Sequence, residues 1–578
     1  MDRQIFADEN LMCSIPLRLG KGAVTNSACH SPLFGEKSDE IPCKMPLQYS
    51  VKYDILNLTV KGGDTMLTTL LAAGLCGIDG FLVNVECDAR ESLGDFEIVG
   101  LPDTAVKEAK ERVRTASYNS GFRFPSLSLT VNLAPANRKK EGSGFDVAIL
   151  TGILRCAGLI DRRVDLSRTC LVGELSLSGA VRPVRGVLSL AAAARDAGLT
   201  EIFVPAENAR EAAAVAGLTV YPLTDMATLV AHLNGTARIT PVVGDEADLG
   251  AAALDAALDF ADVRGQSMAK RALEIAAAGG HNVLLIGPPG TGKSMLAKRL
   301  PTILPPLSFE EAIETTKIHS VAGTLPEGRS LLTARPFRAP HHTMSAVSLV
   351  GGGANPAPGE VSLAHNGVLF LDELPEFPKT VTDTLRQPLE DRRVTITRAA
   401  ARVTFPCSFM MVAAMNPCRC GYYGHPTKPC TCSFTDVRRY ISRISGPLLD
   451  RIDIEVELPS LSYEELAARD AGAETSATVR ARVMRARAYA KARMQGEARI
   501  FCNAQLDAAA IRKYCITDDA ARGLLQSAYD RMGLSARGYD RVMRVARTIA
   551  DLDASEVIGA SHVAEAIQLR SLDKKYWN

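Results

Sequence analysis

The residues best suited to chemistry in this chain lie between positions 287 and 294. The segment fits the pattern G-x-x-x-x-G-K-[ST] of the phosphate-binding loop, or P-loop. An apolar run at 281–286 precedes it as a buried strand would, and 295–300 reads as a helix. This strand–loop–helix context favours a phosphate site over a simple Gly/Pro turn before a core helix. The segment consists of Gly287, Pro288, Pro289, Gly290, Thr291, Gly292, Lys293 and Ser294.

The residue types in this loop suit a nucleotide triphosphate. Glycines let backbone N–H groups turn toward phosphate oxygens, and the start of the following helix adds partial positive charge. Lys293 would reach the β- and γ-phosphates of ATP, and the hydroxyl of Ser294 would hold Mg²⁺.

A second apolar stretch, 367–371, ends in the two acids Asp372 and Glu373. This is the Walker B pattern, in which Asp372 would hold the Mg²⁺ sphere and Glu373 would polarise the attacking water. Taken alone, it would more often be a core strand that ends in surface acids. Because it follows a P-loop at domain distance, it predicts ATP hydrolysis.

The elements that position these residues belong to a chain of 578 residues, which is too long for one core and predicts about three domains. Lys plus Arg number 66 against 65 Asp plus Glu, so any contact with nucleic acid must be local. No apolar run reaches the length of a membrane span, and the polar residues 1–10 give no clear secretory signal. We expect a cytoplasmic protein with no membrane partner. Fourteen cysteines in such a chain favour thiols or a metal site over disulfides.

Composition divides the chain into five segments of a multidomain α/β protein. The first is rich in Ser, Pro, Gly and Lys, and we expect a poorly ordered extension or a start placed too early, with a regulatory tail as the alternative. The segments are the extension (1–65), a mixed α+β domain (66–235), an Ala/Gly/Asp-rich linker (236–256), a motor with a parallel sheet (257–460) and a helical lid (461–578). Within 66–235 the pattern predicts strands at 81–87, 127–133 and 202–205 and helices at 106–118, 147–157 and 190–197.

The sequence at 173–186 resembles the strand–turn–strand signature of the Lon protease domain, which has a ribosomal S5 domain 2-like fold. Ser143 lies near the place where that family carries its nucleophile. The Lon-type mechanism also needs a lysine to take the serine proton, and Leu188 stands at that place. We therefore expect a Lon-like fold without proteolysis.

Further segments of the motor resemble AAA+ ATPases. The resemblance implies that 259–266 lies over the adenine and that Asn416, after an apolar strand, is the sensor 1 residue. It also implies that Arg451 is an arginine finger for a neighbouring subunit and Arg537 the sensor 2 residue, with Arg541 as the fallback. A finger supplied to a neighbour implies a ring, expected to be a homo-hexamer. The alternative for Arg451 is a surface ion pair with a nearby aspartate, Asp450 or Asp453.

Three segments, 335–353, 358–366 and 385–399, resemble the magnesium-chelatase type of AAA+ ATPase. The order of the domains resembles the bacterial ComM (YifB) competence protein family over about residues 66–574. That resemblance implies an ATP-dependent DNA translocase or helicase that promotes branch migration in homologous recombination during natural transformation. The alternatives are a chelatase-like motor that remodels a protein or metal-insertion partner, and a scaffold that binds ATP without hydrolysing it.

Basic residues surround an alternating strand at 394–396, and 403–405 could pair with it as a hairpin. Arg392, Arg393 and Arg398 would then present cations to single-stranded or branched DNA in the pore of a ring. The alternative is a solvated surface hairpin.

The last candidate site is the loop 418–432, with the pattern C-x-C…C-x-C. Cys418, Cys420, Cys430 and Cys432 could close a tetrahedral structural Zn²⁺ site, with His425 as a substitute ligand. The alternative is a set of free or redox-active thiols.

Overall fold

The computed structural model describes residues 66–577, except 93, 244–257, 327–328, 354–355, 399–401, 463, 466–472, 496 and 498–499. The predicted extension at 1–65 and most of the predicted linker lie outside the described residues.

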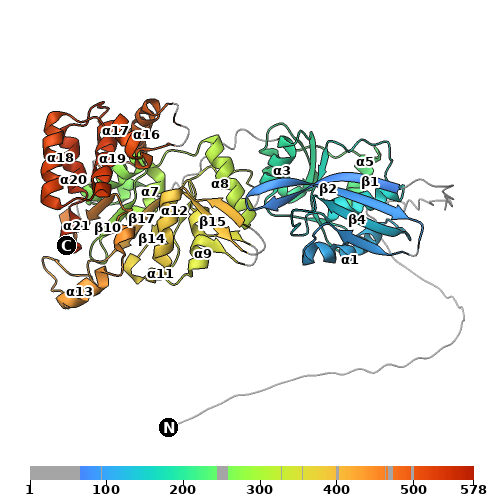
Figure 1. The fold of residues 1–578 in the computed structure, drawn as a ribbon, viewed down its shortest axis with the longest axis horizontal. Helices are drawn as coiled ribbons and strands as arrows, with labels where there is room; N and C mark the ends of the chain where they lie inside the picture. Colours follow the sequence, from blue (N-terminus) through green and yellow to red (C-terminus); the bar gives the residue numbers. More distant parts are fainter. Residues whose placement is uncertain are drawn as a thin grey trace, which may run out of the picture. The chain divides into compact units, whose positions relative to one another are not determined.

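The N-terminal part is built on a seven-stranded mixed sheet with the order β3-β4-β2-β1-β5-β8-β9. The long strands β1 and β2 pair antiparallel (Figure 1), whereas β5, β8 and β9 run parallel to one another. Buried residues of β2 alternate with more accessible ones, as expected for a strand with one face on the core. The strands are β1 (Met66–Cys76), β2 (Asp79–Arg90), β3 (Phe96–Val99), β4 (Ser128–Ala134), β5 (Thr169–Leu171), β6 (Glu174–Leu175), β7 (Val181–Arg182), β8 (Glu201–Pro205) and β9 (Thr219–Leu223).

Each strand and helix predicted between 66 and 235 is present. Strands β6 and β7 form the small antiparallel pair expected from the Lon-like signature. The helices are α1 (Thr104–Asn119), α2 (Asp146–Cys156), α3 (Val187–Asp196), α4 (Ala209–Ala213) and α5 (Met226–Leu233).

The motor contains a five-stranded sheet with the order β11-β14-β17-β10-β18, and all its strands run parallel. Its central strand β10 is buried on both faces: Val283 and Leu285 enter one hydrophobic core, and Leu284 and Ile286 enter the other. Burial of both faces explains why these strands read as continuous apolar runs. The sheet fits an AAA+ domain. Its strands are β10 (Val283–Ile286), β11 (Phe337–Arg338), β14 (Val368–Leu371), β17 (Met410–Met415) and β18 (Ile454–Glu457).

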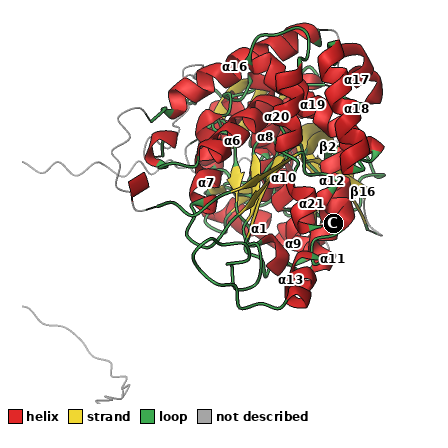
Figure 2. Ribbon diagram, turned by 90° about the vertical axis from the view of Figure 1, so that its left-hand side faces the viewer, coloured by secondary structure: helices red, strands yellow, loops and turns green. Residues whose placement is uncertain are grey.

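Helices and short ribbons surround this sheet, and Figure 2 shows the helices outside the strands. The helices are α6 (Ser267–Gly279), α7 (Lys293–Ile303), α8 (Phe309–Ala322), α9 (Ala346–Val350), α10 (Glu360–Leu363), α11 (Lys379–Thr382), α12 (Arg386–Asp391), α13 (Phe434–Ile441) and α14 (Gly446–Leu449). The ribbons are β12 (Gly351–Gly352) with β13 (Ala357–Pro358), and β15 (Arg393–Thr397) with β16 (Arg402–Pro406).

The C-terminal part consists of helices, and all but the last share the hydrophobic core of the motor on the side of α6 and α7. Tyr576 of the last helix lies in the core on the other face of the sheet. The helices are α16 (Ser476–Arg493), α17 (Ala508–Tyr514), α18 (Asp519–Met532), α19 (Ala536–Leu552), α20 (Ala560–Gln568) and α21 (Leu572–Tyr576). Among the described residues, no helix combines the length and apolar character needed to span a membrane.

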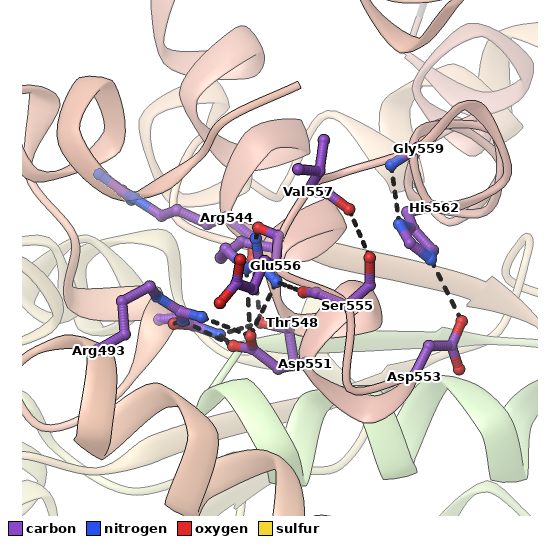
Figure 3. A network of polar contacts seen from close by, with 12 residues as sticks. Arg493, Arg544, Thr548, Asp551, Asp553, Ser555, Glu556, Val557, Gly559 and His562 are labelled. Carbon is purple, nitrogen blue, oxygen red and sulfur yellow. Dashed lines mark hydrogen bonds and ion pairs between the residues drawn. The ribbon is translucent and has the colours of Figure 1, made fainter. Parts of the chain in front are cut away.

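A buried polar network joins α16 to α19 (Figure 3). Asp551, which is 3% exposed, accepts hydrogen bonds from Arg493 at 2.6 and 2.7 Å and from Arg547 at 3.1 Å. Asn503 donates to the same carboxylate at 2.7 Å. Arg547 also donates to the carbonyls of residues 555 and 556. One carboxylate is therefore the shared partner of two guanidinium groups inside the helical part.

We expect Asp551→Asn to destabilise the protein by about 3 kcal/mol or more, because it leaves two largely buried guanidinium groups without a counter-charge. The measurement is the midpoint of thermal unfolding followed by circular dichroism. Asp519→Asn is the matched control, since it breaks the exposed ion pair with Arg522 and should leave the midpoint unchanged. Equal midpoints for both variants would show that the network does not hold the helices together.

Candidate nucleotide site

The P-loop connects the C-terminal end of β10 to the N-terminus of α7, as predicted. Gly290 and Gly292 have φ values of 82° and 89°, a left-handed conformation that favours glycine. A side chain at Gly287 would meet the carbonyl oxygen of Leu458 at 2.6 Å, so this position also requires glycine. The glycines of the motif therefore shape the turn that directs its backbone amides.

The side chain of Lys293 is 8% exposed and lies within the loop. Its Nζ donates to the carbonyls of Gly287 at 2.6 Å and Pro288 at 2.9 Å, and to Oδ1 of Asn416 at 3.1 Å. Burial lowers the pKa of Lys293 to about 8, although Asp372 and Glu373 favour its charged form. The predicted P-loop lysine and sensor 1 asparagine are thus in direct contact.

The two predicted Mg²⁺ ligands also contact each other. Ser294 Oγ donates to Oδ2 of Asp372 at 2.6 Å, which joins the start of α7 to the end of β14. A hydroxyl and a carboxylate are hard oxygen ligands of the kind that Mg²⁺ prefers, so this pair fits the ion. Bound there, Mg²⁺ would neutralise phosphate charge.

Glu373 has φ = 53°, which is uncommon for a residue with a side chain. Backbone strain of this kind concentrates at functional sites. Its carboxylate is 56% exposed and lies 3.6 Å from Nδ1 of His342. The carboxylate is thus accessible to solvent, as a general base that acts on water must be.

His342 is a residue that sequence reasoning did not assign to the site. It follows β11, the strand beside β14, and its ring lies 4.1 Å from that of His341. The signal in the sequence is a histidine pair shortly after a strand that runs parallel to the Walker B strand.

The segment 259–266 reaches the P-loop from another side. Arg299 of α7 donates to the carbonyl of Asp259 at 2.7 Å. Gln266, with φ = 54°, donates from Nε2 to the carbonyls of Thr291 at 3.4 Å and Pro459 at 2.9 Å. These contacts place the segment beside the loop; its predicted contact with adenine stays a prediction.

Arg451 lies at the other end of the sheet. Asn282, just before β10, donates to the carbonyl of Arg451 at 2.8 Å, and its backbone N–H donates to Asp453 at 3.2 Å. The P-loop begins after the opposite end of the same strand. Four residues at about 3.3 Å each separate the two ends by roughly 13 Å. Arg451 is therefore not beside the P-loop of its own chain.

Arg537 is exposed and lies on the same side as Arg451. Both line a groove of about 1340 Å³ that seven arginines border. Burial, and then the nearby Arg570, lower the pKa of Arg541 to about 10, which leaves it charged at neutral pH. The seven are Arg335, Arg392, Arg451, Arg487, Arg537, Arg541 and Arg544.

Two details in this groove differ from the sequence-based expectations. Arg451 forms an ion pair with Glu390 instead of Asp450 or Asp453, because α12 ends beside it. Arg392 does not join the hairpin surface: it follows α12 with φ = 54° and its side chain enters the groove near Asp453 and Arg544.

The predicted hairpin is present. Its inner residues Val394, Ile396, Val403 and Phe405 are buried in the motor core. The outer face carries Arg393 and, near the turn, Arg398, as predicted. It also carries Arg402, whose exposed position follows from the same two-residue alternation.

The remaining predicted sites lie elsewhere. The sulfur atoms of Cys418, Cys420, Cys430 and Cys432 come together within 4.8 Å of one another. In the N-terminal part, Ser143 Oγ donates to Glu174, and Leu188 is fully buried in the core. That this Lon-like domain does not cleave peptides stays a prediction.

Three family models match the chain. "Magnesium chelatase, subunit ChlI" matches residues 259–466, "subunit ChlI of Mg-chelatase" matches 85–208, and "magnesium chelatase, subunit ChlI C-terminal" matches 473–570. Together they cover the Lon-like part, the motor and the C-terminal helices.

The chain can be aligned with several known proteins over nearly the whole length of those proteins. YifB of Salmonella typhimurium and the competence protein ComM of Haemophilus influenzae are each 42% identical over 501 residues, which is 86% of this chain and 96% of each relative. Lon protease of Methanosarcina barkeri is 27% identical over 140 residues, or 23% of this chain. The resemblance to Lon is thus partial.

The pKa of Lys293 predicts how nucleotide binding depends on pH. The ammonium is charged below about pH 8 and loses its proton above it. Phosphate binding favours the charged form, so ADP affinity should stay constant below pH 8 and fall by up to about tenfold for each pH unit above it.

Calorimetry between pH 7.5 and 9.5 measures this dependence, in a range where the phosphates are already ionised. Buffers with different ionisation enthalpies should report proton uptake on binding above pH 8. Lys293→Met is the control that should abolish both effects. Affinity that stays flat to pH 9.5 would contradict the lowered pKa.

Glu373→Gln should retain ATP binding but lose hydrolysis by about 10²–10⁴-fold, because the amide cannot accept the proton of water. Phosphate release is the measurement. Glu376→Gln is the matched control three residues away, where the carboxylate pairs with Arg443, and should hydrolyse ATP at the wild-type rate. Normal hydrolysis by the Glu373 variant would exclude it as the base.

Proposed function

Because this chain belongs to the family of YifB and ComM proteins, we propose that it is an AAA+ ATPase that moves along DNA and promotes branch migration in homologous recombination. ComM is named a competence protein, and the proposal extends that role to the recombination of incoming DNA in natural transformation. ATP and Mg²⁺ are the proposed cofactors.

The observation that carries the proposal is the attachment of a basic hairpin to the nucleotide site. The buried residues Val394 and Phe405 share a hydrophobic core with Leu371 of the Walker B strand. After the hairpin the chain enters β17, which leads to Asn416 beside Lys293. Because packed cores transmit displacement, a movement of β14 or β17 during hydrolysis would move the hairpin.

The outer face of the hairpin has the chemistry of a nucleic-acid contact. Arg393, Arg398 and Arg402 are exposed there, while Thr395 and Thr404 between them are joined at 3.0 Å by their hydroxyls. Arginines neutralise phosphates without reading sequence, which suits a protein that must pass along any DNA.

The groove supports a ring as the acting assembly. Arg451 and Arg537 lie at the edge of the sheet opposite the P-loop. Each would therefore serve the ATP of a neighbouring subunit, where a cation stabilises the transferring phosphate. In this proposal Arg451 leaves Glu390 when it reaches the neighbour's phosphate. A homo-hexamer is the proposed assembly, with the hairpins facing DNA in the pore.

A second candidate is a chelatase-like motor that remodels a protein or metal-insertion partner. The match of all three parts to ChlI models favours it. It would use the same nucleotide site but has no need for DNA, so the response of hydrolysis to DNA separates the two functions.

The triple variant Arg393→Ala/Arg398→Ala/Arg402→Ala should lower the ratio of ATP hydrolysis with DNA to hydrolysis without it. Each lost phosphate contact should also reduce the salt dependence of DNA binding, by about 0.7–0.9 in the slope of log K against log salt. Hydrolysis and fluorescence anisotropy with single-stranded, duplex and branched DNA are the measurements.

The control for this variant is Arg163→Ala, which removes an exposed arginine of the N-terminal part. It should keep the wild-type ratio and slope. Wild-type hydrolysis that is indifferent to every DNA would contradict the translocase and favour the chelatase-like motor.

A further inference from the structure

We propose that Cys418, Cys420, Cys430 and Cys432 bind one Zn²⁺, and that the metal-bound loop braces the P-loop for nucleotide binding. The zinc site stands on its own geometry, whereas its effect on nucleotide binding rests on the proposed ATP site. The two parts therefore need separate measurements.

The distances between sulfur atoms fit a metal. Cys418 and Cys420 are 3.3 Å apart, Cys420 and Cys430 3.5 Å, and Cys418 and Cys430 3.7 Å, with all four Sγ atoms within 4.8 Å. Zn–S bonds of about 2.3 Å in a tetrahedron separate the sulfurs by about 3.8 Å. A disulfide would bring two of them to about 2.0 Å. The cluster therefore has the size of a four-thiolate zinc site.

Backbone N–H groups surround two of the four sulfur atoms. Amides of residues 421 and 423 are directed at the sulfur of Cys418, and those of 422 and 431 at the sulfur of Cys420. N–H groups that surround ligand sulfurs stabilise their negative charge and fix their orientation.

The cysteine loop has few other interactions that would hold its conformation, so a bound metal would stabilise it. Within residues 416–433, all of which the structure describes, the chain forms no helix or strand. Cys418 is fully buried, but the other three cysteines only border the hydrophobic core. A bound metal would supply the cross-links that backbone hydrogen bonds and a core provide elsewhere.

His425 does not act as the substitute ligand considered from the sequence. Its Nε2 lies 2.9 Å from Ser460 Oγ, and its Nδ1 accepts from the backbone N–H of Lys428 at 3.0 Å. Both ring nitrogens therefore have partners outside the cluster, and the ligand set is four thiolates.

The loop contacts the nucleotide site at two points. Gly421 has φ = +87°, and a side chain there would lie 2.6 Å from Cδ of Pro289 in the P-loop. Cys418 follows two residues after Asn416, the partner of Lys293. Zinc would thus hold the backbone that presses on Pro289 and positions Asn416. Release of zinc would loosen one wall of the phosphate site.

The first measurement is metal content and ADP affinity of the full-length protein. We expect about one zinc per chain. Cys430→Ser/Cys432→Ser should lose the zinc and weaken ADP binding by about tenfold or more, as expected for the loss of residues that support a ligand. Cys76→Ser, which removes an exposed cysteine of β1, should retain both properties.

Two further measurements do not use the double variant, so they remain informative if that variant misfolds. Wild-type protein stripped by a chelator should lose ADP affinity and regain it with Zn²⁺ but not with Mg²⁺. Gly421→Ala should keep its zinc yet bind ADP more weakly, because its methyl group displaces Pro289. These readouts need no DNA, so they remain valid if the translocase proposal fails.

Three results would overturn the proposal. Wild-type protein with no zinc that also takes up none on titration would exclude the site, and so would a disulfide among the four cysteines. Zinc that can be removed without any change in ADP affinity, together with normal ADP binding by Gly421→Ala, would exclude the bracing role.

Discussion

The polarity of the parallel sheet constrains everything else in the motor. The P-loop, Asp372, Glu373 and Asn416 all follow the C-terminal ends of adjacent strands, where side chains from parallel strands converge. Arg451 precedes β18 and therefore lies at the other edge. A single chain cannot bring both edges to one phosphate. The division of these groups between two edges is the physical reason for proposing an assembly in which each subunit completes the site of the next.

Burial restricts the movement of the strands that carry the nucleotide site. Strand β10 is buried on both faces, so the start of the P-loop cannot move without disturbing two cores. The basic hairpin packs on one of these cores, and the C-terminal helices with their Asp551 network pack on the other. The cysteine loop adds a contact with Pro289 at the phosphate site itself. Nucleotide chemistry is thereby connected to each surface proposed to bind a partner.

Local patterns allowed much of this to be predicted from the sequence. The P-loop and the Walker B strand were recognisable because their chemistry requires fixed residues at fixed spacing within one strand, loop and helix. The hairpin was recognisable because alternation of apolar residues decides which side chains face the core. That same alternation would also have identified Arg402, which was overlooked.

Features that depend on tertiary packing could not be predicted in this way. The direction of Arg392 is decided by the left-handed residue after α12, and the partner of Arg451 by where that helix ends. The approach of His342 to Glu373 depends on the pairing of β11 with β14. Cysteine spacing indicated a ligand set, but not that Gly421 would press against the P-loop. For residues 1–65, the predicted extension lies outside the described residues and stays a prediction.

The most direct test of the shared site is to mix two inactive variants, Lys293→Ala and Arg451→Ala. Each alone lacks one half of every site and should not hydrolyse ATP. A mixed ring pairs the intact P-loop of one variant with the intact arginine of the other, so an equal mixture should regain about one quarter of wild-type activity. No recovery from variants that still assemble, or normal hydrolysis by Arg451→Ala alone, would contradict a site formed between subunits.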